Sequence, residues 1–396
     1  MISLDEAFAA VEVIALPLPA ERVPLIEAFD RVLAVPLLAR TDAPARPLSA
    51  MDGYAVREAD LGRLPVDLPV QQVIFAGHAD PAPLAAGACA RIFTGAPVPE
   101  GADRIIVQEQ VEALEGGARF SETPGKARHI RACGSDFHAN EILLDAGALL
   151  TPQAMVAAAA ADFATLQVVR RPKVFVLGTG DELAEPGLPG ERPGMIPETV
   201  SFGVMAMAAR WGAEPVGRRR VEDDSSALET AAAEALKIAD VVVVTGGASV
   251  GERDHARAMF ASAGLELIFS KVAIKPGKPV WMGRAGGRLV VGLPGNPTSA
   301  MVTARLFLAP LLAGLVGRGA GTALSWRSLT LAEGLPTPGE RETLLRGKRM
   351  SGGDVAPLGN QESGAQRALA GSDLLIRRPA GAPPALAGET VSCLDF

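Results

Sequence analysis

The stretch Val241–Asp254 reads VVVVTGGASVGERD and decides the fold. Its four consecutive valines predict a short strand buried on both faces, as in a parallel sheet. Gly246 and Gly247 follow the strand, where glycine lets backbone N–H groups approach an anion closely. Ser249 and Glu252 have the spacing of a capping box, which predicts a helix beginning at this loop. The combination is typical of a phosphate or oxyanion cradle, and a ligand-free βα turn is the alternative.

Three more turns of this kind occur in the same half of the chain. The apolar strand Val174–Leu177 leads into GTGDE, residues 178–182. The segment Lys271–Pro279 (KVAIKPGKP) carries three lysines, and Val290–Pro297 (VVGLPGNP) is a third apolar strand ending in a polar turn. Asn296 is the expected N-cap of the apolar helix that follows. Because strand ends of an open α/β sheet converge on one crevice, the pattern predicts a site for a phosphorylated or anionic ligand.

Composition excludes several classes of protein. A chain of 396 residues is expected to form several domains, and its net charge of −7 argues against nucleic acid or an acidic membrane surface as a partner. Cys89, Cys133 and Cys393 form neither a disulfide framework nor a zinc motif. The acidic N-terminus does not resemble a signal peptide, and the apolar run Ala154–Ala161 is too short to span a bilayer. We expect a cytoplasmic protein.

Periodicity divides the chain into helical, mixed and β-rich segments. Ser3–Ile14 predicts a capped amphipathic helix, and Thr151–Thr165 predicts an alanine-rich helix. Short strands broken by glycine and proline fill residues 60–147 and return after Gly317. Strands and helices alternate between residues 173 and 317, as in a doubly wound three-layer domain. The fold class is therefore multidomain α/β plus β, and Leu25–Leu38 fits either a helix or paired short strands.

Two acids have both a structural and a functional explanation. Asp52 precedes Gly53 in SAMDGYAVR, and from the residues alone an ordinary turn residue is the better explanation. Asp223 precedes the predicted helix Ser225–Ala239, where helix capping and a magnesium role explain it equally well.

Six segments together resemble a known family. SAMDGYAVR, TGAPVPEGAD, GTGDEL, TGGASVGERD, AIKPGKP and GLPGNPTS occur in this order. They closely resemble the molybdopterin molybdenumtransferase family, which comprises the MoeA proteins and the E-domain of gephyrin. The resemblance covers essentially the whole chain. It implies insertion of molybdenum from molybdate into adenylylated molybdopterin, with release of AMP and with Mg²⁺ as the cofactor.

The resemblance also implies an architecture. A central three-layer αβα molybdopterin-binding domain is expected over residues 173–317, and a small C-terminal β-barrel over residues 318–396. Residues 46–147 correspond to a β-rich lid, and residues 1–45 with 148–172 to a helical/linker dimerisation domain. In an elongated homodimer of this kind, the lid reaches the pocket of the second subunit. Further partners implied are the adenylylating enzyme and apo-molybdoenzymes or their chaperones.

Site residues follow from positions that match the family's motifs. The implied catalytic acids are Glu182, Asp254, Asp223 and Asp52, and Glu182 and Asp223 are the implied metal ligands. The implied substrate-binding residues are Thr94, Arg131, Asp136, Thr179, Gly180, Gly246, Gly247, Ser249, Gly251, Glu252, Lys271, Lys275, Lys278, Pro294, Asn296, Ser299, Arg346 and Ser363. Among these, Ser299, Arg346 and Ser363 match the molybdate-binding set.

Two positions depart from the family pattern. Val200 replaces an asparagine in the motif after GTGDEL, and Glu362 replaces a small residue beside Ser363. They motivate a second hypothesis, a paralogue that carries or senses molybdopterin or molybdate without efficient turnover. A third is a nucleotide-processing enzyme built on the same α/β domain.

Overall fold

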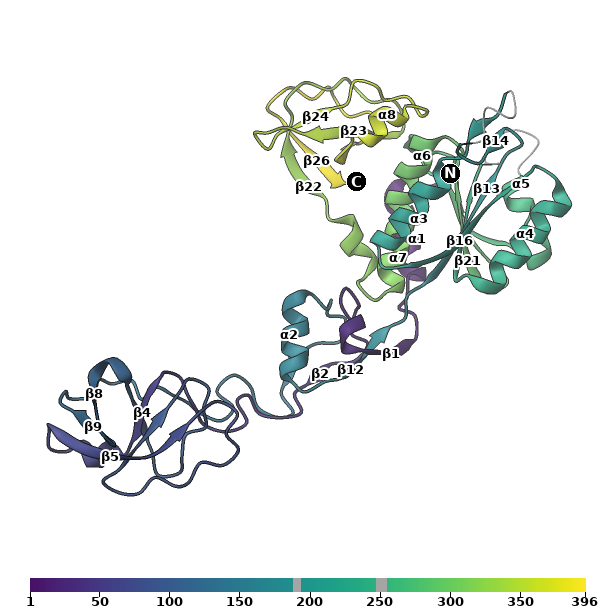
Figure 1. The fold of residues 1–396 in the computed structure, drawn as a ribbon. Coiled ribbons are helices and arrows are strands. Elements are labelled where there is room, and N and C mark those ends of the chain that lie inside the picture. Colours follow the sequence, from purple (N-terminus) through teal and green to yellow (C-terminus); the bar gives the residue numbers. More distant parts are fainter. Residues whose placement is uncertain (188–193, 247–254) are drawn as a thin grey trace.

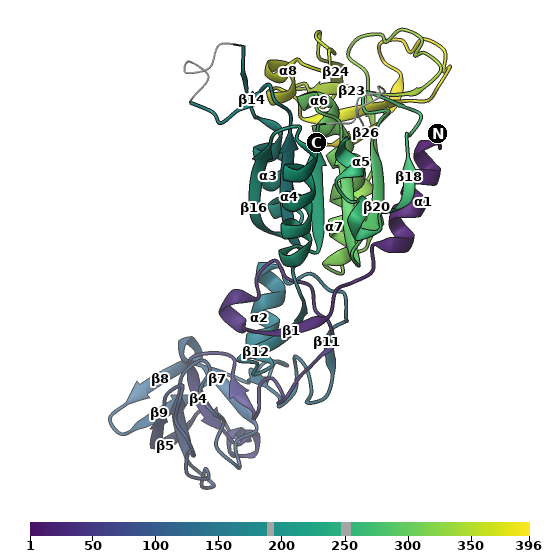
Figure 2. The same ribbon diagram turned by 90° about the vertical axis from the view of Figure 1, so that its right-hand side faces the viewer.

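The structure is a computed structural model that describes residues 1–187, 194–246 and 255–396. Figure 1 shows an elongated molecule whose α/β unit and terminal β unit lie at one end. A linker unit around α2 follows, and a distal β unit around β4 and β5 forms the opposite end. Figure 2, turned by a quarter, shows the same succession of units.

The α/β unit is built on a six-stranded sheet with the order β16-β13-β17-β21-β20-β18. Its strands are, in that order, β16 (Glu214–Val221), β13 (Lys173–Thr179), β17 (Val241–Thr245), β21 (Arg288–Leu293), β20 (Trp281–Ala285) and β18 (Glu266–Ser270). The first four strands are parallel, and β17 is fully buried, as its valines predicted. The sequence interpretation missed β20, which returns antiparallel to β21 and makes the sheet mixed.

Helices cover both faces of this sheet and confirm the three-layer prediction (Figure 1). On one face lie α1 (Leu4–Ile14), α3 (Val200–Arg210) and the continuous helix Pro297–Leu315. The last comprises α6 (Pro297–Thr303), the π-helical segment η6 (Ala304–Leu308) and α7 (Ala309–Leu315). On the other face lie α4 (Ser225–Ile238) and α5 (His255–Ala258).

The helix Pro297–Leu315 is the most apolar helix of the described chain. It is long and apolar enough to cross a membrane by length and composition, with a mean hydropathy of 1.5, yet 94% of that stretch is buried inside the protein. Its side chains join the main hydrophobic core with those of α1, α3 and the sheet. It is therefore placed as a core helix.

Helix α1 belongs to this core as well. Ser3 Oγ accepts a hydrogen bond from Glu6 N at 3.1 Å, and Glu6 Oε2 accepts one from Ser3 N at 2.7 Å, which confirms the predicted capping box. Leu4, Ala7 and Val11 are buried against the α/β unit. The expected division grouped residues 1–45 with the linker, but the apolar face of α1 places the first turns of the chain in the α/β core.

The linker unit joins two separate parts of the chain. In it, β1 (Ala20–Pro24) pairs with β12 (Thr165–Val169), and β2 (Leu37–Leu38) pairs with β11 (Ile142–Leu144). Helix α2 (Pro152–Ala160) starts at the predicted cap Thr151. The helix ends earlier than expected, because Asp162 takes a left-handed conformation with φ of 65°, which reverses the chain before β12. The segment from Leu25 forms a 3₁₀ turn, η1 (Leu25–Glu27), and then the short strand β2.

The distal β unit contains the predicted short strands. Its six-stranded sheet has the order β7-β4-β6-β5-β9-β8. The strands are β7 (Arg104–Val107), β4 (Gly53–Val56), β6 (Cys89–Ile92), β5 (Val66–Ile74), β9 (Gly117–Phe120) and β8 (Val111–Leu114). A separate pair, β3 (Leu48–Ser49) with β10 (Ile130–Arg131), and the turns η2 (Glu58–Leu61) and η3 (Gln108–Gln110) complete it.

The terminal β unit is also a small sheet, and it includes one short strand, β19 (Ile274–Lys275), from the segment of the chain that belongs to the α/β unit. Its strands are β22 (Arg327–Thr330), β23 (Glu342–Arg349), β24 (Val355–Pro357), β25 (Leu374–Arg378) and β26 (Thr390–Asp395). The strand β19 pairs with β23 and ties the lysine segment to this unit. Helix α8 (Gln366–Ala370), the turns η5 (Ala261–Ala263) and η7 (Ala320–Leu324), and the pair β14 (Leu183–Ala184) with β15 (Ile196–Pro197) complete the described elements.

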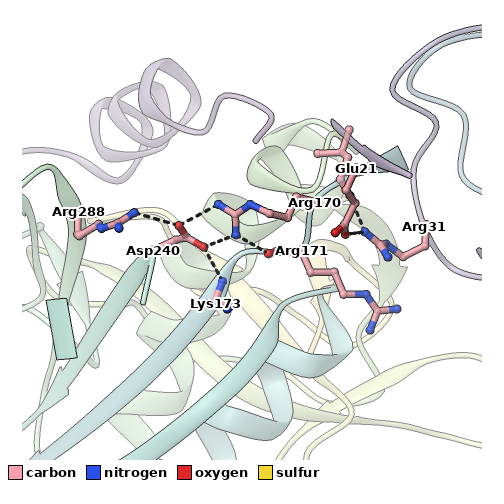
Figure 3. Close-up of polar contacts among 8 residues, drawn as sticks. Glu21, Arg31, Arg170, Arg171, Lys173, Asp240 and Arg288 are labelled. Atoms are coloured by element: carbon pink, nitrogen blue, oxygen red, sulfur yellow. Dashed lines mark hydrogen bonds and ion pairs between the residues drawn. The ribbon is translucent and has the colours of Figure 1, made fainter. Parts of the chain in front are cut away.

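One half-buried acid joins the linker to the sheet. Figure 3 shows Asp240, directly before β17, between Arg170 and Arg288. Its carboxylate accepts hydrogen bonds from Arg170 Nη1 and Nη2 at 2.8 and 3.0 Å, and from Lys173 N at 2.8 Å. Burial is the largest single influence and opposes ionisation of Asp240, but the hydrogen bonds from Arg170 and Lys173 N and the charges of Arg170 and Arg288 together outweigh it and lower the pKa of the carboxyl.

Replacing Asp240 with asparagine is expected to lower the free energy of unfolding by about 2 kcal/mol at neutral pH, since hydrogen bonds to an ionised group are lost. Because the folded pKa lies below its ordinary value of 3.8, the wild-type advantage is present above that pH and disappears as the pH falls through the folded pKa. Urea denaturation across pH measures this. Asp145→Asn, at an exposed position, is the control, and equal stability of the two variants would contradict the assignment.

Candidate active site

A cavity of about 780 Å³ lies at the carboxyl ends of β13, β17 and β21. We call it the main cavity. It brings together nine of the sequence-predicted residues: Thr179, Gly180, Glu182, Asp223, Gly246, Lys271, Lys278, Pro294 and Asn296. The expectation that four separate turns converge on one crevice is therefore confirmed for the described parts of those turns.

The turns that follow β13, β17 and β21 form the floor of the main cavity, and they approach one another so closely there that glycine is required. Gly246 has φ of 100°, and a Cβ added there would lie 2.3 Å from the carbonyl oxygen of Thr179. A Cβ on Gly295 would lie 3.3 Å from Gly246 Cα. The turns after β13, β17 and β21 thus touch one another through their backbones, which leaves peptide groups rather than side chains at the floor.

Two acids stand at the cavity. The Glu182 carboxylate turns back over Gly180, where an added Cβ would lie 2.7 Å from Glu182 Oε2. Asp223 lines the same space, and its backbone N–H donates to Asp181 Oδ1 at 2.9 Å. Both predicted metal ligands therefore face one cavity.

Two of the three predicted lysines, Lys271 and Lys278, line the same cavity as these acids. A tight loop positions them: Lys271 N donates to Val280 O, and Val272 N donates to Lys278 O, both at 3.0 Å. Both side chains are exposed, and neither forms an ion pair with a carboxylate in the described part of the chain. Lys275 is also exposed, but it lies in β19 and does not line the main cavity.

The wall formed by residues 196–200 was missed as part of the site. Glu198 is only 2% exposed, accepts a hydrogen bond from Ser201 N at 2.9 Å, and lies 3.6 Å from Arg218 Nη1. An acid in the family-like motif after GTGDEL was the signal that could have identified it. Val200, one of the two departures, lines the cavity while packing into the main core, so the fold accommodates its apolar side chain.

Arg346 of β23 connects the terminal β unit to the N-terminus of α6 at the main cavity. The residue is 1% exposed, and burial lowers the pKa of its guanidinium. Nη1 donates to Thr298 Oγ1 and Ala365 O at 3.0 and 3.4 Å, Nη2 donates to Asn360 O and Glu362 O at 3.1 Å, and Nε donates to Gln361 Oε1 at 3.4 Å. Each of its N–H groups thus has a protein acceptor. In this geometry the guanidinium holds the loop over α6, and the molybdate contact of Arg346 stays a prediction.

The loop held by Arg346 reaches the N-terminus of α6. Thr298 N donates to Ser363 O at 3.1 Å, and Gly364 and Gln366 line the main cavity. Ser363 and the buried Ser299 lie beside the cavity without lining it. Glu362, the second departure, is exposed, and its carboxylate forms no ion pair within the described residues.

The four predicted residues of the distal β unit lie far from this cavity. Asp52 directly precedes β4, which Figure 1 places at the opposite end of the molecule from α6. Asp52 Oδ1 accepts hydrogen bonds from Thr94 N and Thr94 Oγ1 at 2.7 Å, and the backbone donor is the main cause of a lowered pKa of this carboxyl. Arg131 and Asp136 are exposed in the same unit. A single chain does not bring these residues to the main cavity.

Five predicted residues lie outside the described residues: Gly247, Ser249, Gly251, Glu252 and Asp254. Among residues 1–187, 194–246 and 255–396, no group of three or more histidine, cysteine or acidic side chains is arranged to hold a metal ion.

Comparison with known proteins agrees with this geometry. Family models match residues 2–161 (MoeA N-terminal region, domains I and II), 175–314 (probable molybdopterin binding domain) and 328–396 (MoeA C-terminal region, domain IV). A molybdopterin molybdenumtransferase of Haemophilus influenzae is 38% identical over 320 residues, which cover 80% of this chain and 78% of the relative. The chain belongs to the molybdopterin molybdenumtransferase family.

Other members of the molybdopterin molybdenumtransferase family are similar along nearly the whole chain. Molybdopterin molybdenumtransferase 2 of Mycobacterium tuberculosis is 36% identical over 391 residues and covers 94% of both chains. The crystal structure of a molybdopterin biosynthesis MoeA protein from Pyrococcus horikoshii superposes with a TM-score of 0.86 at 28% identity, covering 100% of this chain and 99% of that one. The predicted fold class is confirmed, and membership places the chain in molybdenum cofactor biosynthesis.

Arg346→Lys is expected to lower the free energy of unfolding by about 2 kcal/mol, because an ammonium group cannot serve the acceptors that the guanidinium bridges. Urea denaturation followed by circular dichroism measures the change, and Arg367→Lys, an exposed position on α8, is the matched control. Unchanged stability together with loss of molybdate binding would show instead that the guanidinium serves the ligand.

Proposed function

We propose that this protein inserts molybdenum from molybdate into adenylylated molybdopterin and releases AMP. The observation that carries the proposal is the main cavity, where two acids, three glycine turns and two lysines without an ion pair among the described residues meet at the strand ends. A phosphorylated pterin and an oxyanion are both anionic, so the chain's net charge of −7 makes these local cations necessary for binding.

The lysines and the floor bind the anionic groups. Lys271 and Lys278 neutralise phosphate oxygens as point charges, while the backbone of the glycine turns approaches them without side-chain obstruction. The turn Pro294–Pro297 places the N-terminus of the helix Pro297–Leu315 at the same cavity, which adds its positive dipole end.

The acids fit a magnesium ion shared with the substrate. Mg²⁺ commonly binds through one or two carboxylates plus substrate phosphates and water, and rarely in a cage made only of protein ligands. Glu182 and Asp223 face one cavity, which satisfies this requirement. The ion would supply charge neutralisation at the phosphoanhydride, and Glu182 and Asp223 are the residues proposed to hold it.

Four of the proposed residues require a second subunit. The distal β unit carries Asp52, Thr94, Arg131 and Asp136, and we propose that it acts as a lid on the main cavity of a partner copy. Exposed apolar side chains on α1 and in the linker unit support a homodimer: Val13, Leu16, Ile26, Phe29 and Val156 are 74%, 66%, 87%, 55% and 71% exposed. The domain division expected from the resemblance is proposed with the amendment that α1 joins the α/β unit.

The cellular setting is part of the same proposal. A cytoplasmic location is consistent with three free cysteines, and it would give access to the adenylylating enzyme and to apo-molybdoenzymes or their chaperones. The carrier and nucleotide-processing alternatives are not favoured, because relatives named molybdopterin molybdenumtransferase match nearly the full chain.

A defined reconstitution tests the function. Purified protein is incubated with adenylylated molybdopterin, molybdate and Mg²⁺, and AMP release and molybdenum-cofactor formation are followed together. We expect molybdate-dependent AMP release that matches cofactor formation. Tight binding of the pterin without AMP release would overturn the transferase assignment in favour of a carrier.

Glu182→Gln is expected to slow AMP release about 100-fold, because the variant keeps the shape of the side chain and removes its charge from the cavity. Thermal stability should stay at the wild-type level, since Glu182 is an exposed loop residue. Glu229→Gln on α4 is a matched control at an exposed position. Wild-type turnover by the Glu182 variant would remove this acid from the mechanism.

The double variant Lys271→Ala/Lys278→Ala is expected to weaken binding of adenylylated molybdopterin by about 100-fold, at roughly tenfold for each lost charge-assisted hydrogen bond. Titration calorimetry at low ionic strength measures the affinity. Lys126→Ala/Lys348→Ala removes the same charge from exposed positions outside the main cavity. If both double variants lose affinity equally, general charge rather than the cavity lysines governs binding.

A further inference from the structure

A second cavity, of about 350 Å³, lies at a different place in the α/β unit. It is lined by Arg210, Trp211, Arg305, Arg318, Thr322, Ser325, Arg327 and Asp395. We call it the arginine cavity. Helix α3 begins at the main cavity with Val200 and ends at the arginine cavity with Arg210. These two residues are separated by about 15 Å of helix, at 1.5 Å per residue, so the two cavities are distinct.

The charge of the arginine cavity is strongly unbalanced. Its lining holds four arginines and a single carboxylate, Asp395. Asp395 is already shared with Arg349 and lies 3.6 Å from Arg327 Nη2. Arg318 pairs with Asp30 at 2.8 Å. Within the described parts of the chain, Arg210 and Arg305 form no ion pair with an aspartate or glutamate side chain, and Arg210 Nη1 donates a hydrogen bond to Phe396 O at 3.0 Å.

Arg305 is the deepest of these cations. It is 5% exposed, lies on the π-helical turn η6, and stacks over Trp211 with its Cζ 5.2 Å from the ring centroid. Nε donates to Asp395 O at 2.6 Å and Nη1 donates to Ala323 O at 2.7 Å. Its guanidinium therefore meets neutral carbonyl oxygens where a buried cation normally has an anion. Burial, followed by the nearby charge of Arg210, lowers the pKa of Arg305 to about 10.

Other donors around the cavity also remain unused. Arg318 Nε is buried without a hydrogen-bond partner, and Nη2 of Arg305 donates to no described protein atom. The hydroxyls of Thr322 and Ser325 already donate to Gly319 O and Thr322 O at 2.7 and 3.0 Å, so the available donors are the arginine N–H groups that have no acceptor among the described residues. Guanidinium groups match the geometry of phosphate oxygens through paired N–H donors.

We propose that the arginine cavity binds the phosphate group of a small molecule, separately from the substrates of the main cavity. Its cations come from α3, from the long core helix, from the segment that contacts the linker, and from β22 of the terminal β unit. A bound phosphate neutralises the facing charges of Arg210 and Arg305 and joins these elements. Inorganic phosphate and a phosphate ester share this chemistry.

Titration calorimetry with inorganic phosphate and with pyrophosphate, at low ionic strength, tests the proposal on the full chain. The Lys271→Ala/Lys278→Ala background removes the lysines of the main cavity. Saturable binding of at least one of the two probes is expected to persist there and to weaken tenfold or more when Arg210→Ala/Arg327→Ala is added. Both arginines are exposed, so these changes are compatible with folding, which an unchanged thermal midpoint verifies.

The matched control is Arg63→Ala/Arg284→Ala in the same lysine background. Both positions are exposed and lie outside the arginine cavity, so this control is expected to retain the affinity for phosphate. Absence of saturable binding of both probes, or an equal loss in the control, would overturn the proposal. Comparison of phosphate with glycerol 3-phosphate distinguishes a site for the free ion from a site for a phosphate ester, because only an ester site binds the latter at least as tightly.

Discussion

The shared register of three parallel strands is the constraint on which the site depends. Gly178 of β13, Thr245 of β17 and Leu293 of β21 are aligned across the sheet, with Thr245 paired to both neighbours. Because the strands end level, their turns meet and their glycines come into backbone contact. A shift of one strand would carry its turn away from the other two and would separate the cavity lysines from the acids. Burial of β17 on both faces holds this register.

The terminal β unit contributes to the same cavity through a buried arginine. The guanidinium of Arg346 donates hydrogen bonds to Thr298 of α6 and to the loop that covers this helix. In addition, β19 pairs with β23 and so attaches the lysine segment to the terminal β unit. Arginine is suited to this task because one planar group bridges several acceptors. The lysines remain outside such networks in the described structure, which keeps their charge available for a ligand.

Local charge differs sharply from net charge in this protein. The chain is acidic overall, yet two cavities along the same helices of the α/β unit each contain cations that pair with no acidic side chain among the described residues. Net charge therefore excluded broad classes of partner but did not reveal either cavity. The lysines of the main cavity could be predicted because they cluster in KVAIKPGKP. The four arginines of the second cavity are spread from residue 210 to residue 327, and no local pattern connects them.

The sequence by itself determined the fold class, the buried strand at its centre, the capped helices and the convergence of glycine turns, because each depends on residues close together in the chain. The motifs also predicted nine residues that line the main cavity. Only the tertiary structure decided that α1 joins the α/β core, that β20 turns the sheet mixed, and that Glu198 forms a wall of the site. It also showed that Arg346 holds the loop over α6, and it placed Asp52 far from the cavity of its own chain. These outcomes depend on contacts between distant segments, and local sequence patterns carry no information on which partner satisfies a buried polar group.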